Sequence, residues 1–381
     1  MVERVGTALI YELYPMPAFA REGINGEPCS MSAGTSTIHA SHGLIGQNLT
    51  PMDDVIIVVE NGRILHAGPA VDHPAEGAVE MGEATIIPGF IDAHVHIGFF
   101  PPLEVLLGGV TTVRDLAWPP DEIWPLVERA AEPDFEGPRI LAAGQMLTAP
   151  GGYPTEASWA PPGTGFVVAS PVDAREAVDR QLSRGASIIK IALNPPAGPT
   201  LPAAVIEAIV IAAHDHGARV TGHVHGLAEL IKALDAGIDE LAHMLMSDEV
   251  IPDEVISRLV EQDVTIVPTL SVRFEDLGVA IDNTSRFLAA GGRVVYGTDL
   301  GNEGPGPGID KREVEALFSA GMGVRDIIRA ATAGAADYLG LDQKGAIEVE
   351  RDADLVAVAP LDDPASLTEI RGVWRGGRRA D

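Results

Sequence analysis

Short apolar runs rich in β-branched residues recur through the middle of the chain, and most are followed by a turn and a helical pattern. Such alternation is typical of a parallel sheet that is buried on both faces. Eight runs lie at residues 86–97, 110–116, 139–147, 187–193, 218–224, 238–244, 264–270 and 293–299. They predict an α/β fold of the (β/α)8 TIM barrel type over residues 89–345, close to the roughly 250 residues of such barrels.

Helix boundaries are clearest in the second half of the chain. A helix is predicted over 202–213, with Thr200 as its N-cap, and another over 252–260, whose first turn is acidic. Two further helices are predicted over 310–320 and 324–339. The last of these closes at Gly340, because glycine tolerates the left-handed conformation that ends many helices.

The flanks alternate in a strand-like way and predict a small β-sandwich built from both chain ends. Residues 1–88 supply its N-terminal part and residues 346–381 its C-terminal part. The strand-like segments are 8–14, 55–60, 63–67, 355–358 and 372–375. Asn61-Gly62 is a strong hairpin signal.

Two segments read as long loops. Residues 15–52 show little periodicity and are predicted to be a loop insertion, to which we assign no function. Residues 148–171 follow the third barrel strand, where barrel enzymes build their sites. This loop either forms a wall or lid through Tyr153 and Trp159, or is merely solvated.

The amino-acid composition limits the classes of molecule that this protein is expected to bind. Twenty-six basic against 55 acidic residues give a formal charge of −29, which disfavours nucleic acid and anionic membranes. The single cysteine, Cys29, excludes an internal disulfide and a cysteine-built zinc site. Glu3 and Glu12 interrupt any signal-peptide pattern, and no run approaches the roughly 18 apolar residues of a membrane helix. We therefore expect a soluble cytoplasmic protein that acts on a small molecule, with homo-oligomerisation left open.

Candidate metal ligands begin at the end of the first strand, in the sequence PGFIDAHVH. His94 and His96 are two residues apart, so both side chains share one face of the strand and can hold one metal ion. Alone the pair is modest evidence, since strand histidines also occur as ordinary polar residues.

Further polar residues end other strands: Lys190, His223, His243 and Asp299. Each of these residues could have a purely structural role. Together, however, they are predicted to lie at the carboxyl face of an otherwise apolar barrel, which indicates a functional site. Lys190 is the most diagnostic, because burial would lower its pKa and favour the neutral amine. A neutral amine can take up carbon dioxide and become a carbamate, an anionic ligand able to bridge two metals.

This combination resembles the amidohydrolase superfamily, and within it the binuclear-metal branch of prolidase and imidazolonepropionase-like enzymes. The motifs span nearly the whole chain: PGFIDAHVH, VTTVRDL, the strand-four lysine, HVHG, AHM, GTDLG and DADLVAV. The resemblance implies two divalent ions, zinc before manganese or cobalt. His94, His96 and Asp299 would bind one, His223 and His243 the other, and carboxylated Lys190 would bridge them.

Several neighbouring residues are assigned with alternatives. His225 shares a face with His223, so it is either a catalytic contact to the substrate or the true ligand in place of His223. Arg114 and Asp115 either bind substrate or, as the motif favours, form a structural ion pair beneath the site. Arg273 is the candidate cation for a substrate carboxylate. We expect structural or solvated roles for the remaining histidines: His39, His42, His66, His73, His214 and His216.

The resemblance implies metal-dependent hydrolysis of an amide-type bond in a dipeptide, an Xaa-Pro peptide or an N-acyl amino acid. A metal-bridging hydroxide would attack the carbonyl, and Asp299 would carry the proton to the leaving amine. The alternatives are a lactonase or carbamate hydrolase with the same site, a one-metal imidazolone hydrolase or deaminase, and a non-catalytic scaffold. Gly226 stands where such deaminases carry glutamate, which argues against them.

Overall fold

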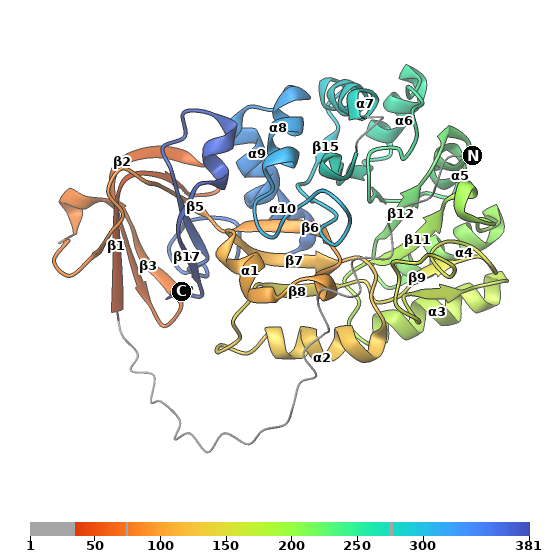
Figure 1. The fold of residues 1–381 in the computed structure, drawn as a ribbon, viewed down its shortest axis with the longest axis horizontal. Coiled ribbons are helices and arrows are strands. Elements are labelled where there is room, and N and C mark those ends of the chain that lie inside the picture. The colour runs from red at the N-terminus through yellow and green to blue at the C-terminus, as the bar shows by residue number, and fades with distance from the viewer. Residues whose placement is uncertain (1–34, 74, 274–276) are drawn as a thin grey trace, which may run out of the picture.

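Two parallel sheets form the centre of the molecule. The computed structural model describes residues 35–73, 75–273 and 277–381. One sheet has the order β6-β7-β8, and the other the order β10-β9-β11-β12-β13-β14-β15 (Figure 1). The strands are β6 (Phe90–Val95), β7 (Val110–Asp115), β8 (Arg139–Ala142), β9 (Met146–Thr148), β10 (Gly165–Val167), β11 (Ile189–Leu193), β12 (Val220–Val224), β13 (Glu240–Leu241), β14 (Thr265–Ile266) and β15 (Arg293–Val294).

Backbone hydrogen bonds join the two sheets into a ring. The Ser187 amide donates to the Ala142 carbonyl at 2.8 Å, which links β8 to the segment before β11. On the other side, the Ala93 amide of β6 donates to Tyr296, just beyond β15, at 3.0 Å. The fold is therefore TIM-barrel-like, as the apolar runs predicted.

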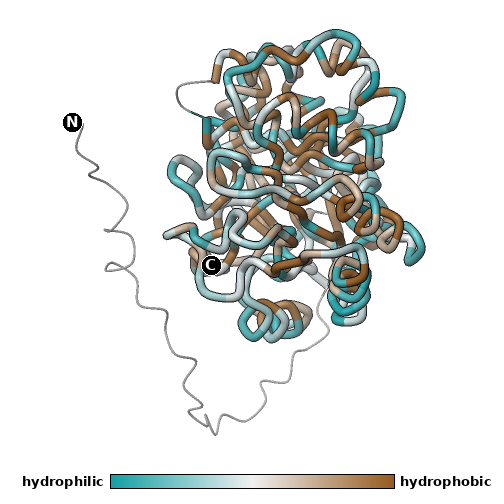
Figure 2. The backbone as a smooth tube through the Cα atoms, turned by 90° about the vertical axis from the view of Figure 1, so that its right-hand side faces the viewer, coloured by the Kyte–Doolittle hydropathy of each residue, from teal (hydrophilic) through white to brown (hydrophobic). Residues whose placement is uncertain are grey.

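Ten α-helices in the described residues connect and cover these strands. They are α1 (Pro102–Leu107), α2 (Pro120–Ala130), α3 (Pro171–Ser183), α4 (Ala203–Asp215), α5 (Leu227–Asp235), α6 (Asp253–Glu261), α7 (Leu277–Ala289), α8 (Lys311–Ser319), α9 (Val324–Ala331) and α10 (Ala333–Leu339). Hydrophobic stretches of the chain lie mainly in the interior, while hydrophilic stretches gather at the periphery (Figure 2). None of these helices combines the length and the apolar character needed to cross a bilayer.

Three predicted elements are divided or shifted in the structure. The run 86–97 breaks at Gly89, where a Cβ would lie 2.3 Å from Thr111 Oγ1, so its first part leaves the barrel as β5 (Thr85–Pro88). The helix 324–339 is divided at Thr332, whose φ of −133° and ψ of −100° separate α9 from α10. The N-cap of α4 is Pro202 and not Thr200.

The two chain ends meet in one mixed sheet of the order β18-β17-β16-β5-β1-β2-β3, with β4 paired to β1. Its other strands are β1 (Thr35–Ile45), β2 (Thr50–Glu60), β3 (Arg63–Pro69), β4 (Val79–Glu80), β16 (Leu355–Val358), β17 (Ile370–Arg375) and β18 (Arg378–Arg379). A separate apolar core supports this sheet. A division into the two layers of a sandwich stays a prediction.

The prediction of a loop over 15–52 is wrong for residues 35–45 and 50–52, which form β1 and the start of β2 on either side of a turn. The polar residues of β1 obscure the alternation of apolar positions that would predict a strand. Pairing with β2 supplies its hydrogen bonds, and the local sequence pattern does not indicate that pairing. The hairpin at Asn61-Gly62 is confirmed, with φ of 52° and 79° at the two residues. The predicted strand 8–14 and Cys29 lie outside the described residues.

Candidate metal centre

A cavity of about 210 Å³ opens at the carboxyl ends of the barrel strands. All six residues predicted as metal ligands line it, although they come from strands far apart in the sequence. Its lining consists of His94, His96, Met146, Tyr153, Lys190, His223, His243, Met246, Val272, Asp299, Asn302 and Glu303. The strand order thus brings together the side chains that the sequence analysis grouped by position.

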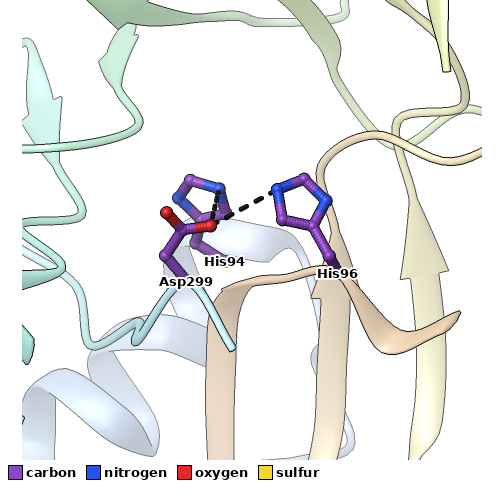
Figure 3. A group of neighbouring side chains, drawn as sticks. All are labelled: His94, His96 and Asp299. Carbon is purple, nitrogen blue, oxygen red and sulfur yellow. Dashed lines mark ion pairs between the residues drawn. The ribbon is translucent and has the colours of Figure 1, made fainter. Parts of the chain in front are cut away.

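His94, His96 and Asp299 form the tightest group in this cavity. Asp299 Oδ1 lies 3.2 Å from His94 Nε2 and 3.3 Å from His96 Nε2, and the three side chains point toward one another (Figure 3). All three are buried. Among the described residues, they are also the group whose ligand atoms lie close enough to hold one metal ion.

Backbone carbonyls fix the orientation of both imidazoles. His94 Nδ1 lies 2.7 Å from the Ala242 carbonyl, and His96 Nδ1 lies 3.0 Å from that of Ala117. A carbonyl only accepts hydrogen bonds, so each Nδ1 must donate, and each neutral ring turns the lone pair of Nε2 toward Asp299. When both rings are neutral, two nitrogen lone pairs and a carboxylate oxygen converge at one point, which fits a bound cation.

The electrostatics of the group also favour positive charge. Burial lowers the pKa of His96, but the nearby Asp299 carboxylate outweighs it, and the net pKa is raised. Burial, followed by the positive charge of Lys190, holds the pKa of His94 well below its usual value. The position beside Asp299 therefore attracts a positive charge, for which a metal ion and a proton compete.

His223 and His243 form a second pair in the cavity, and the ring of His243 lies 4.7 Å from that of His94 between centroids. His223 Nδ1 lies 3.0 Å from His243 Nε2, and Asn194 Nδ2 lies 3.1 Å from His223 Nε2. His243 Nδ1 is 2.8 Å from Thr269 Oγ1. Burial holds the pKa of both rings well below its usual value, so both are neutral, the form that binds metals.

Lys190 lies between these groups with its amine sealed from solvent. Its side chain is 1% exposed, and Nζ has no hydrogen-bond partner among the described residues. Burial lowers its pKa to about 7, against attraction from Asp299 that works to raise it. A buried amine without a partner is costly for a folded protein, which indicates a functional requirement at this position.

Buried carboxylates support the ligands from beneath, and the sequence analysis missed their roles. Asp92 accepts from the His94 amide at 3.0 Å and from Thr298 Oγ1 at 2.6 Å, which ties the first strand to the segment that carries Asp299. Burial raises the pKa of Asp92 to about 7. Its place two residues before His94, on the same strand face, was the signal that could have found it.

The expected ion pair of Arg114 with Asp115 is wrong. Arg114 instead pairs with Glu240 through two contacts of 2.8 Å, both side chains being fully buried. Asp115 accepts from the amides of Ile97 and Ala117. The reason is geometric, because neighbours in a strand point to opposite faces.

The loop that follows the third strand forms a wall of the site. The ring of Tyr153 stacks on His223 at 4.8 Å between centroids, and the ring of Trp159 lies 5.0 Å from that of His96. Burial raises the pKa of Tyr153, so its phenol stays protonated. Of the two alternatives for this loop, the contacts support the wall.

Two candidate residues are not among those that line the cavity. His225 follows the end of β12, is half-buried and is not among the lining residues. Arg273 is 4% exposed and its guanidinium donates to the carbonyls of Met244, Leu245 and Ser247. In this structure neither side chain lines the cavity, and a contact of His225 with substrate stays a prediction.

The comparisons with known proteins agree with this geometry. The sequence profile of the Amidohydrolase family matches residues 103–380. The chain is 24% identical to an ochratoxinase of Aspergillus niger over 86% of this chain and 83% of that protein. It is 27% identical to an imidazolonepropionase of Deinococcus deserti over 87% of this chain and 94% of that one.

Solved structures share the fold. The crystal structure of a Xaa-Pro dipeptidase with bound methionine superposes with a TM-score of 0.75 at 22% identity, covering 91% of this chain and 99% of that one. The resemblance inferred from the sequence motifs is thereby confirmed at the level of the family.

Proposed function

Because the chain belongs to the amidohydrolase family, and is thus a hydrolytic enzyme acting on carbon–nitrogen bonds, we propose that it uses metal ions to hydrolyse an amide-type bond. The substrate class that we propose is a dipeptide, an Xaa-Pro peptide or an N-acyl amino acid. The name of one structural neighbour, a Xaa-Pro dipeptidase, supports this class. The observation that carries the proposal is the convergence of six buried ligand-type side chains in one cavity.

The donor set supports two divalent ions, with zinc as our first choice. His94, His96 and Asp299 would hold one ion, and His223 and His243 the other, through nitrogen and oxygen atoms that suit zinc. Lys190, once carboxylated, would be the bridging ligand, for which its partnerless amine supplies the nucleophile. When bound, such ions acidify a water molecule and polarise a carbonyl.

Asp299 is proposed to move the proton. Its Oδ1 faces the two histidines of the first group, while Oδ2 lies 3.9 Å from His243 Nδ1. The carboxylate is 5% exposed and lines the cavity, so it can accept a proton from attacking water and donate it to the leaving nitrogen. Tyr153 covers His223 and shields this exchange from bulk water.

The test combines metal analysis with a panel of free and blocked dipeptides, N-acyl amino acids and lactones. We expect about two zinc equivalents per chain and turnover of an amide. The Asp299→Asn variant should lose about 10²–10⁴-fold in kcat/KM, the contribution typical of general acid–base catalysis.

Asp337→Asn is the matched control, because Asp337 is exposed on α10 and away from the cavity. Unchanged circular dichroism would show that both variants fold. Full activity of Asp299→Asn would overturn the proton role. Turnover of lactones alone would replace the amide class, and a chain without metal or turnover would be a scaffold.

A further inference from the structure

Apart from the six ligand-type residues, the lining of the cavity is almost free of charged side chains. Outside the six ligand-type residues, its lining contains one charged side chain, Glu303, next to the amide of Asn302. The other lining residues there are uncharged: Met146, Tyr153, Met246 and Val272. Among the described residues that line the cavity, no arginine is present, and the single lysine is the buried Lys190.

The nearest alternative cation serves the protein itself. Arg273 follows the lining residue Val272, but its guanidinium is buried and donates to three backbone carbonyls of the segment 244–247. It also lies 3.1 Å from the sulfur of Met246, so it holds a wall residue in place. The Arg273 guanidinium is therefore used in hydrogen bonds within the protein and is not available to bind a substrate carboxylate.

Glu303 stands in a loop that keeps it at the cavity mouth. The loop leaves the barrel at Asp299, which has a φ of 59°, and Gly301 then lies so close to His96 that a Cβ would approach its Cβ to 2.8 Å. Glu303 itself is exposed and makes no hydrogen bond or ion pair with the described residues, so its carboxylate is available to a ligand.

We propose that Glu303 is a specificity-determining residue that selects substrates carrying a protonated amine. This inference rests on the proposed hydrolase function and names its substrate class more narrowly. Tyr153 lines the same cavity, and its aromatic ring is a favourable neighbour for a cation. The formal charge of −29 also raises the local concentration of cations over that of anions.

The test measures binding separately from turnover. Benzylamine, benzyl alcohol and benzoate share one ring and carry positive, zero and negative charge. Calorimetry on the zinc-loaded protein should show benzylamine binding more tightly than benzyl alcohol. Glu303→Gln should weaken benzylamine by about tenfold and leave benzyl alcohol unchanged, as expected for one partly desolvated ion pair. Glu303→Lys should reverse the preference toward benzoate.

Glu207→Lys is the control. It changes the net charge as much as Glu303→Lys does, but Glu207 is exposed on α4 and does not line the cavity. Equal shifts in Glu303→Lys and Glu207→Lys would overturn the local role, as would benzylamine binding that ignores Glu303→Gln. The proposed function fails on different results, namely absent zinc and absent turnover. Zinc-dependent turnover, together with ligand binding that does not depend on the charge of the ligand or of residue 303, would therefore refute this inference and leave the proposed function intact.

Discussion

Two of the four lysines of this chain lie in opposite environments. Lys190 is buried at the carboxyl end of the barrel, without a hydrogen-bond partner for its amine. Lys344 lies near the mixed sheet, where its amine contacts the carboxylates of Asp352 and Asp354. The first position is unfavourable for folding and suited to chemistry, whereas the second is satisfied and structural.

The same contrast separates the two cavities that these lysines line. The one beside Lys344 is larger, about 720 Å³, and also contains Arg63 and Arg375. Its charges are largely compensated: Arg63 lies 3.0 Å from Asp352, and Arg375 donates to the carbonyls of Ala130 and Phe135. Unsatisfied buried groups therefore identify the candidate site better than cavity volume does.

The largest effect is expected at Lys190. Lys190→Met should lower kcat/KM by about 10³-fold or more, because positioning of the metals accounts for several kcal/mol of transition-state stabilisation. The unfolding free energy of the metal-free protein should stay equal or rise, since an apolar side chain replaces a buried amine that lacks a partner. Kinetics and urea unfolding of the same preparation measure both quantities. A large loss of stability would contradict the contrast between the two lysines.

Lys344→Met should show the reverse pattern. The Asp354 side chain is 5% exposed and would keep its charge without its cation, which should lower the unfolding free energy by about 3 kcal/mol. At temperatures where the variant is folded, kcat/KM should be unchanged. Lys311→Met is the matched control, because Lys311 is 61% exposed and lies 3.7 Å from Glu315, a pair that contributes about 0.5 kcal/mol at most. Equal losses of unfolding free energy in Lys344→Met and Lys311→Met would refute the structural role of Lys344.

The smallest effect concerns His39, which joins β1 to its neighbours. Hydrogen bonds to Asp54 and then Glu80 raise the pKa of His39 above 6.5. The folded protein thus holds this proton more tightly than the unfolded chain does. The resulting stabilisation is present below pH 6.5 and is lost as the pH rises through the higher folded pKa.

Removing His39 should therefore flatten stability against pH. His39→Gln should remove about 0.5 kcal/mol of unfolding free energy at acidic pH and little at alkaline pH, as expected for a largely solvated ion pair. Urea unfolding at about pH 5.5 and about pH 8.5 compares the two states. A constant difference between the variant and the parent at both pH values would show that His39 acts by packing alone.

Local signals were enough to predict the barrel and to gather its candidate ligands. His94 and His96 follow from the two-residue period of a strand, and Lys190, His223, His243 and Asp299 from their place at the ends of apolar runs. Because parallel strands present their carboxyl ends at one rim, position along each run already determines which side chains meet. The grouping needed no knowledge of loops.

Only the tertiary structure decided the partners of these residues. Arg114 finds Glu240 across 126 positions of sequence, and Arg273 turns to backbone carbonyls instead of the cavity. Strand β1, concealed by its polar residues, is stabilised by β2 and by contacts that His39 makes with distant carboxylates. Periodicity along a chain records which face a side chain occupies. The choice of partner depends on distances in space, which are set only when the whole chain has packed.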